Sequence, residues 1–174
     1  MEELVKVTHI IGGGEFGGAE EHLLLLLTQL KKEGISPRVI CFYDALFAKR
    51  LRENGIPVDV LSFGRFDFRL YFGLVRLLKE QKPDIIHTHG VKANFFGRLA
   101  AKKVGLAPIV TTVHSLLRYD YIHPVARILA TLLDKSTRGL TDQYIAISEK
   151  IKAQLETERI PANKIEVIHH GIQV

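Results

Sequence analysis

Short apolar runs alternate with longer amphipathic segments along almost the whole chain, and this alternation constrains the fold more than any other feature. The short runs are typical of strands, whereas the longer segments space their apolar residues three and four apart, as helices do. Runs that are apolar throughout, such as the one that begins at Ile109 and Val110, indicate strands buried on both faces. The alternation therefore predicts an α/β domain with a doubly wound, Rossmann-like parallel sheet.

The same pattern gives the bounds of the expected elements. We expect strands at Leu4–Ile11, Pro37–Tyr43, Pro57–Leu61, Asp84–Thr88, Ile109–Val113, Gln143–Ile147 and Ile165–Ile168. We expect helices at Ala19–Glu33, Ala45–Asn54, Phe68–Gln81, Lys92–Val104, Pro124–Ser136 and Glu149–Glu158. Gly34, Gly55, Pro83 and Gly105 lie between these segments, as turn residues should. No repeat or low-complexity linker interrupts them, so residues 1–174 are expected to form a single domain.

A glycine-rich turn joins the first expected strand to the first expected helix. It contains Gly12, Gly13, Gly14, Gly17 and Gly18. Glycine has no Cβ, so the backbone here can approach a ligand closely. The free N–H groups and the dipole at the start of the following helix favour an anion. The turn therefore predicts a phosphate-binding loop, and a tight strand-to-helix turn without a ligand is the alternative.

The spacing of Gly12, Gly14 and Gly17 also satisfies the dinucleotide-binding pattern G-x-G-x-x-G. That pattern calls for an acidic residue about 20 residues further along the chain. Asp44 is the candidate, but it lies further away and at the expected start of the next helix. A dinucleotide-binding oxidoreductase domain is therefore one alternative, and a non-catalytic nucleotide-binding module is another.

The composition excludes several classes of protein. With 47% hydrophobic and 25% charged residues, the 174-residue chain can bury a proper core. No apolar run approaches the ~20 residues of a membrane span, and Met1 leads into a strand without a signal peptide. The single cysteine, Cys41, allows no disulfide framework and is expected in the core. We therefore expect a cytoplasmic protein.

The formal net charge of +5 is mildly basic. Scattered Lys and Arg side chains on a solvated surface are the simplest explanation. Attraction to phosphorylated substrates, or to anionic lipid headgroups at the inner face of a membrane, is the alternative. Nucleic acid is not an expected partner, because no nucleic-acid-binding motif accompanies the charge.

Histidines cluster where expected strands end, which is the edge at which parallel α/β sheets bind their ligands. His87 and His89 are two residues apart, so both point to one side of a strand. A zinc site needs three or four protein ligands, and no third ligand is evident at this edge, so we expect no metal. His114 ends an apolar strand, where an imidazole can contact a sugar hydroxyl or stabilise developing charge. It is the candidate catalytic residue.

Aromatic and basic side chains interleave between Phe63 and Phe72. Packing of the helix that follows accounts for part of the aromatic residues. It does not account for Arg65 and Arg69, which could hold an anionic acceptor such as a sugar on a lipid phosphate or diphosphate. With His89, these two arginines are the candidate acceptor-binding residues. Together with the basic second helix, they could also rest on a charged membrane surface.

Several motifs occur in an order that is typical of one family. They are Gly-Gly-Ala-Glu-Glu-His at 17–22, Asp-Ile-Ile-His-Thr-His-Gly at 84–90, Val-Thr-Thr-Val-His at 110–114, Ile-Ala-Ile-Ser-Glu at 145–149 and Asn-Lys-Ile-Glu-Val-Ile-His-His-Gly-Ile at 163–172. Over essentially its whole length, the chain resembles the N-terminal domain of retaining glycosyltransferases of family 4, which have the two-domain GT-B architecture. It departs from many relatives at His170 and Gln173, where they carry Asn and Asp.

The resemblance implies that the glycine loop, residues 12–18, faces the diphosphate of a UDP- or GDP-linked sugar donor. It implies that His114 lies beside the donor sugar and that this domain chiefly binds the acceptor. In the family, a second domain with a pair of glutamates completes the active site. That donor-binding domain is expected to be absent from this chain, which alone should be inactive. The design requires no cofactor or metal ion, in agreement with the absence of an Asp-x-Asp pair.

Overall fold

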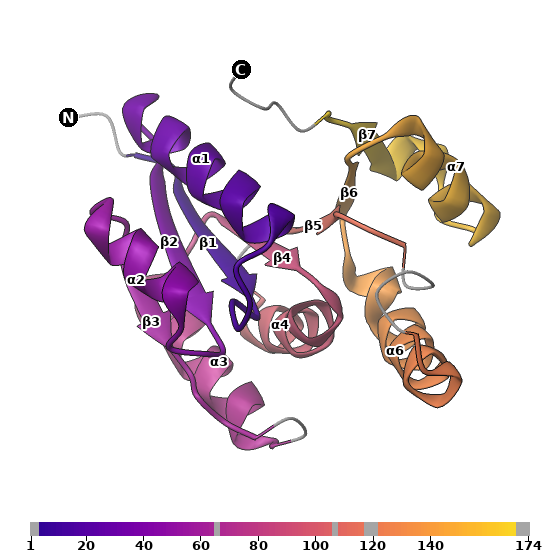
Figure 1. Ribbon diagram of the computed structural model, residues 1–174, viewed down its shortest axis with the longest axis horizontal. Helices are drawn as coiled ribbons and strands as arrows, with labels where there is room; N and C mark the ends of the chain where they lie inside the picture. The colour runs from indigo at the N-terminus through magenta and orange to yellow at the C-terminus, as the bar shows by residue number, and fades with distance from the viewer. Residues whose placement is uncertain (1–3, 65–66, 106–107, 117–121, 170–174) are drawn as a thin grey trace.

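The computed structural model describes residues 4–64, 67–105, 108–116 and 122–169, and it confirms the predicted α/β class (Figure 1). One parallel, seven-stranded sheet runs through the described residues in the order β3-β2-β1-β4-β5-β6-β7. The strands are β1 (Lys6–Ile11), β2 (Ser36–Cys41), β3 (Val58–Val60), β4 (Ile85–His89), β5 (Ile109–Val113), β6 (Gln143–Ala146) and β7 (Ile165–Val167).

The helices lie where the periodicity placed them. They are α1 (Gly18–Lys32), α2 (Leu46–Glu53), α3 (Arg69–Gln81), α4 (Val91–Val104), α6 (Pro124–Thr137) and α7 (Glu149–Thr157). Two short 3₁₀ helices, η1 (Arg138–Leu140) and η2 (Ala162–Lys164), were not expected. A single turn is too short to show a periodic apolar pattern, so the sequence carries no signal for either.

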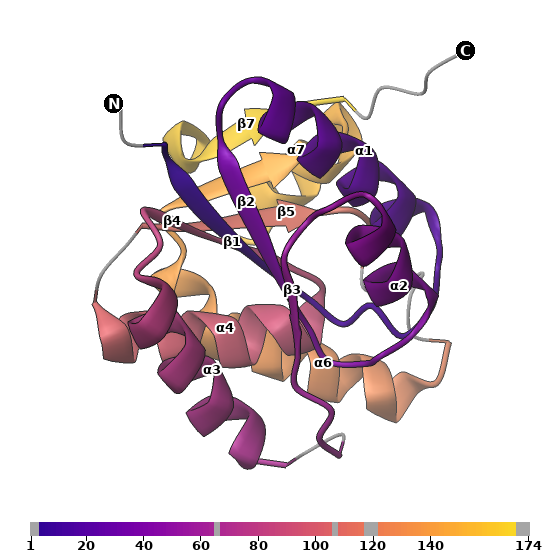
Figure 2. The ribbon, with the colours of Figure 1, turned by 90° about the vertical axis from the view of Figure 1, so that its left-hand side faces the viewer.

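Alternate residues of each central strand point to opposite faces of the sheet, and each face has its own core. Ile11 and Val39 pack with Leu23 of α1 and with residues of α2. Ile10 and Ile40 pack instead with side chains of α3 and α4. Figure 2 shows α3, α4 and α6 grouped together, away from α1 and α2. Because both faces are covered, the strands are apolar throughout, as the sequence indicated.

The strand order reverses between β1 and β4, which are direct neighbours. The chain proceeds outward from β1 to β3, then crosses back to β4 and proceeds outward the other way to β7. Ligands of open α/β sheets bind at such a switch point, outside the carboxyl ends of the strands. The glycine loop after β1 and the histidines of β4 therefore lie at the place where the fold favours a site.

Cys41 is buried at the end of β2, as predicted, and burial raises the pKa of its thiol to about 12. Among the described residues, no helix combines the length and the apolar character that crossing a bilayer would need.

Candidate ligand-binding site

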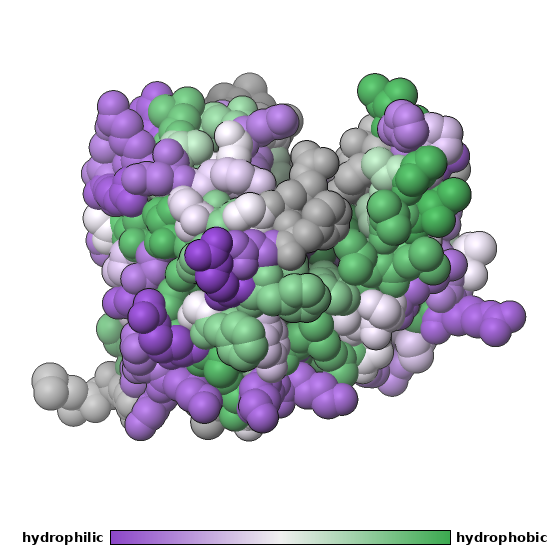
Figure 3. Space-filling view, turned by 90° about the horizontal axis from the view of Figure 1, so that it is seen from below, coloured by the Kyte–Doolittle hydropathy of each residue, from purple (hydrophilic) through white to green (hydrophobic). Residues whose placement is uncertain are grey.

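A cavity of about 370 Å³ opens at the carboxyl ends of β1, β4 and β5. It is lined by the loop after β1, the first turns of α1 and α4, the end of β5, and residues of α6 and α7. Three residues singled out in the sequence, Gly12, His89 and His114, share this one cavity. Figure 3 views the molecule from below, the side toward which β1 points in Figure 1, and shows hydrophilic and hydrophobic surface intermixed there.

The glycines of the loop serve two different purposes. Gly13 has a φ of +69°, which favours glycine, and a Cβ on Gly14 would lie only 2.9 Å from the ring of Tyr43. The tight turn thus accounts for these two positions. A Cβ on Gly12 or Gly18, in contrast, would meet no atom within 4 Å. Gly12 lines the cavity, so the space beside it is open to a ligand.

The charges around the loop are mixed. The carboxylate of Glu20 accepts a hydrogen bond from the backbone N–H of Gly17, at 3.2 Å, and thereby occupies a donor at the start of α1. Glu20 also lines the cavity, as does Lys92 on the first turn of α4. The Lys92 ammonium lies 5.3 Å from the ring centroid of Phe42 and 5.5 Å from that of Tyr43. Lys92 thus adds a cation to the cavity that Gly12 lines. The sequence reasoning overlooked it, since one lysine at a helix start gives no pattern.

The histidines form a larger cluster than the sequence indicated. His9 of β1 is paired in register with His87 of β4, and both are buried together with His89. Nδ1 of His9 lies 3.1 Å from Nε2 of His89, and Nδ1 of His89 lies 3.0 Å from Nε2 of His114. The expectation that no third metal-ligand candidate lies near His87 and His89 was wrong. Neighbouring parallel strands bring His9 beside His87 and His89, which follow it by 78 and 80 residues, and sequence spacing cannot show this.

Burial decides the charge state of these rings. It lowers the pKa of His9 to about 3, and it lowers the pKa values of His87 and His89 well below the ordinary value for histidine. Neighbouring histidines add to the effect at His87 and His89, because each ring disfavours a positive charge on the next. Around pH 7 the three rings are therefore neutral. His87 contacts the Thr112 hydroxyl at 2.7 Å through Nε2.

Asn94, on the first turn of α4, was also missed by the sequence reasoning. Its side chain lines the cavity and is buried, and among the described residues its Oδ1 has no hydrogen-bond partner. A buried amide oxygen without a partner is costly. Asn94 is therefore a further candidate for contacting a ligand in the cavity.

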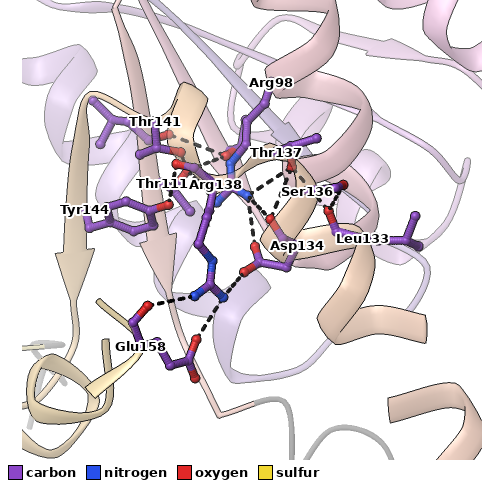
Figure 4. Close-up of polar contacts among 12 residues, drawn as sticks. Arg98, Thr111, Leu133, Asp134, Ser136, Thr137, Arg138, Thr141, Tyr144 and Glu158 are labelled. Atoms are coloured by element: carbon purple, nitrogen blue, oxygen red, sulfur yellow. Dashed lines mark hydrogen bonds and ion pairs between the residues drawn. The ribbon is translucent and has the colours of Figure 1, made fainter. Parts of the chain in front are cut away.

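The far wall of the cavity contains a buried ion-pair network, drawn in Figure 4. Arg98 of α4 is fully buried and donates to Asp134 of α6 at 2.9 Å. Arg138 pairs with the other oxygen of Asp134, at 2.6 Å, and with Glu158 at 2.8 Å. Two cations and two carboxylates compensate each other, which buried charges require. The network therefore connects α4, α6 and the end of α7 behind the site.

The other candidate acceptor residues lie elsewhere. Arg69 starts α3, pairs with Asp67 at 2.6 Å and lies over the ring of Phe63, and it does not line the cavity. Arg65 lies outside the described residues. Close to Arg69 is a separate apolar groove, which we call the aromatic groove. It is lined by Phe68, Tyr71, Phe72, Phe96, Leu99, Lys102 and Lys103.

The sequence pattern of Glycosyltransferase Family 4 matches residues 16–174, and the chain belongs to this family. The family match favours a glycosyltransferase over the dinucleotide-binding oxidoreductase alternative.

Individual relatives are more distant. The chain is 28% identical over 109 residues to the UDP-Gal:alpha-D-GlcNAc-diphosphoundecaprenol alpha-1,3-galactosyltransferase of Escherichia coli, a match that covers 62% of this chain and 28% of that enzyme. It superposes on Anabaena Alr3699/HepE in complex with UDP and glucose with a TM-score of 0.73 and 22% identity, over 97% of this chain and 45% of that one.

A UDP-N-acetylglucosamine 2-epimerase is similarly close in fold, with a TM-score of 0.74 and 21% identity over 95% of this chain and 48% of that one. The chain thus spans less than half the length of these solved structures. The likeness confirms that its fold is one half of a GT-B structure.

Proposed function

We propose that residues 1–174 form the acceptor-side half of a retaining glycosyltransferase, which a donor-binding domain completes. In this proposal the complete protein transfers a sugar from a nucleoside-diphosphate donor to an acceptor in cell-envelope glycan or glycolipid synthesis. The observation that carries it is the single cavity shared by Gly12, His89 and His114, in a chain that belongs to family 4. The fold alone does not carry it, because an epimerase has the same fold.

The donor diphosphate is proposed to lie against the loop of Gly12, Gly13, Gly14, Gly17 and Gly18. The open space beside Gly12 and the ammonium of Lys92 support this placement. The Glu20 carboxylate opposes an anion at the start of α1, so the phosphates are expected on the Gly12 side of the loop. The similar Anabaena structure contains UDP and glucose, which supports a nucleotide-linked donor.

His114 is proposed as the catalytic group and Asn94 as a partner for a sugar hydroxyl. Both line the cavity at the carboxyl ends of the sheet. A group held there can stabilise charge that develops as the nucleoside diphosphate leaves and an oxocarbenium-like centre forms.

The acceptor is proposed to be a sugar on a lipid phosphate or diphosphate. The name of the Escherichia coli relative includes a diphosphoundecaprenol acceptor, which supports this class. The aromatic groove places apolar rings beside Lys102 and Lys103, a combination that suits a lipid with an anionic headgroup. Such an acceptor would bring the protein to the inner face of a membrane.

Nucleotide binding tests the proposal. The ¹H–¹⁵N NMR spectrum of the chain would be followed while UDP, UDP-sugars, GDP-sugars or NAD is added. We expect a nucleotide-sugar to shift the signals of the loop after β1, of Lys92 and of His114. Shifts at these residues with NAD, and none with either class of nucleotide-sugar, would instead identify the dinucleotide-binding alternative.

A further inference from the structure

Helix α6 exposes a row of apolar side chains on the surface of the protein. They are Val125, Ile128, Leu129 and Leu132, each between 50% and 59% exposed, and Ile122 shortly before the helix is 94% exposed. The four helix positions follow the spacing i, i+3, i+4 and i+7, so they share one side of α6 over ~10 Å of its length. Figure 3 shows hydrophobic surface on its right-hand side, where α6 lies in Figure 1. Apolar side chains gathered on one exposed surface indicate a contact with a partner or a membrane.

The opposite side of α6 is already held by the protein itself. Ala130 and Thr137 are buried, and Asp134 pairs with the buried Arg98 of α4 at 2.9 Å. A helix on the surface of a globular protein normally turns charged and polar residues to water on its outer side. The outer side of α6 is apolar instead, and packing among the described residues does not account for it.

The charges beside the apolar row are positive. Arg127 and Lys135 are exposed and line a groove of about 300 Å³ between α6 and α7. The only carboxylate in the sequence of α6 is that of Asp134, and two arginines already neutralise it. The Glu158 carboxylate, which also lines the groove, pairs with one of these arginines at 2.8 Å. The outer side of α6 therefore offers aliphatic side chains and cations together.

An anionic lipid surface is the partner that fits this combination. Aliphatic side chains of an amphipathic helix enter the boundary between headgroups and acyl chains, and adjacent cations attract anionic headgroups. We propose that the outer side of α6 contacts an anionic membrane surface. Ile128, Leu129 and Leu132 enter the lipid, and Arg127 and Lys135 bind phosphate groups of the headgroups.

A second copy of the chain fits less well. In a two-fold symmetric contact the same surface faces itself, so α6 would meet two further cations and no available carboxylate. The aromatic groove is a separate surface, because its residues lie on or next to α3 and α4. Membrane contact through α6 is independent of sugar transfer, so either proposal can fail without the other.

Tryptophan fluorescence tests the contact directly, because the chain contains no tryptophan of its own. Leu129→Trp should emit as a solvent-exposed indole in buffer. Its emission should move to shorter wavelength with phosphatidylglycerol vesicles but not with phosphatidylcholine vesicles. Leu46→Trp on the basic helix α2 is the matched control, since Leu46 and Leu129 are both 50% exposed, and its emission should not move.

Three results of this experiment would overturn the proposal. Short-wavelength emission of Leu129→Trp before vesicles are added would show that protein already covers α6. Unchanged emission with anionic vesicles would show that α6 does not enter the lipid. An equal or larger change in Leu46→Trp would mean that the membrane contact is not made by α6.

Sedimentation with the same vesicles measures how strongly the chain binds. The double change Ile128→Ser and Leu132→Ser should weaken binding at least about tenfold, because two aliphatic side chains no longer enter the lipid. The control, Leu25→Ser with Leu46→Ser, removes two exposed leucines of α1 and α2 and should leave binding unchanged. Equal binding by the α6 variant and the unaltered chain, or an equal loss in the control, would contradict the proposal.

Changing Arg127 and Lys135 to Gln should weaken binding to anionic vesicles by about fivefold per charge and reduce its dependence on salt. In the full-length protein, the double change Ile128→Ser and Leu132→Ser should weaken vesicle binding as it does in the chain. If it had no effect there, the remainder of the protein would cover α6. Sedimentation velocity without vesicles should show a monomeric chain, and a dimer that this double change dissociates would identify a second copy as the partner instead.

Discussion

At the level of single residues, the glycines of the loop after β1 are present for two different reasons. Gly13 and Gly14 are required by the turn itself, through a positive φ and the nearby Tyr43 ring. Gly12 has open space beside it and lines the cavity. Some glycines of the loop are therefore needed for the turn, and others leave room for a ligand. The side chains around each glycine show which of the two applies.

Gly12→Val is expected to weaken binding of a nucleotide-sugar at least about tenfold, or about 1.4 kcal/mol, because the side chain fills space needed by the phosphates. The thermal midpoint should stay close to that of the unaltered chain, since the new Cβ meets no atom within 4 Å. Calorimetric titration and thermal unfolding measure the two quantities. Gly139→Val is the control, because Gly139 has equally open surroundings and does not line the cavity. Equal affinities of the two variants for the nucleotide-sugar would show that the loop is not part of the binding site.

In the full-length protein, His114→Ala is expected to reduce turnover by about two to three orders of magnitude. The acceptor KM should change only a few-fold, because the ring is proposed to act where charge develops in the transition state. Steady-state kinetics separate the two effects. A variant with normal turnover and a strongly raised acceptor KM would place His114 among the acceptor-binding residues.

At the scale of elements, the ion pairs behind the cavity connect helices that are distant in sequence. Arg98 of α4 is fully buried, and its charge is compensated by Asp134 of α6. Arg138 and Glu158 extend the network to the end of α7. The aromatic groove lies elsewhere, between α3 and α4, where exposed Phe68 and Phe72 meet two lysines.

Asp134→Ala is expected to destabilise the fold by about 3–5 kcal/mol, because it leaves the buried Arg98 without its carboxylate. Urea unfolding followed by circular dichroism measures the free energy of unfolding. Glu80→Ala removes a carboxylate from the exposed pair with Arg76, which are 3.8 Å apart, and should cost about 1 kcal/mol or less. Similar losses in both variants would mean that the buried network contributes no more than a surface pair.

Sedimentation with liposomes tests the aromatic groove. The chain is expected to bind anionic but not neutral vesicles, less strongly as salt is added, because basic residues near the surface attract anionic lipid. Changing Lys102 and Lys103 to Ser should weaken this binding. Changing Arg69 to Ser should weaken it less, since Asp67 already neutralises that charge.

A charge-matched control for the groove is the change of Lys32 and Lys152 to Ser, on α1 and α7. If this control weakened vesicle binding as much as the change at Lys102 and Lys103, net charge rather than the groove would account for it. If no lipid-dependent binding occurred, a non-lipid acceptor would be favoured.

At the scale of the whole molecule, the buried histidines make stability depend on pH. The pKa of His9 is lowered from 6.5 to about 3. Between these two pH values, His9 binds a proton in the unfolded chain but not in the folded chain. The contribution of such a histidine to the free energy of unfolding is therefore fully present above pH 6.5. As the pH decreases below this value, each such histidine lowers the free energy of unfolding by about 1.4 kcal/mol per pH unit. His87 and His89 should steepen this loss, because burial lowers their pKa values as well.

Urea unfolding between pH 7 and pH 4 measures this slope. His9→Leu should lower this slope by about 1.4 kcal/mol per pH unit, the contribution of one proton, because the variant lacks the buried ring. The same slope in His9→Leu as in the unaltered chain would mean that His9 is charged, or exposed to solvent, in the folded protein.

Local patterns along the chain were enough to predict the class of fold, the places of the strands and helices, and the family. Apolar periodicity and turn residues are local signals, and they suffice for these because each element reflects its own residues. Which side chains meet became evident only in the folded structure. Strand order brings His9 beside His89, helix packing buries Arg98 against Asp134, and Asp67 neutralises the Arg69 charge that the sequence assigned to an acceptor. Contacts between distant segments depend on sheet topology and packing, which no local pattern encodes.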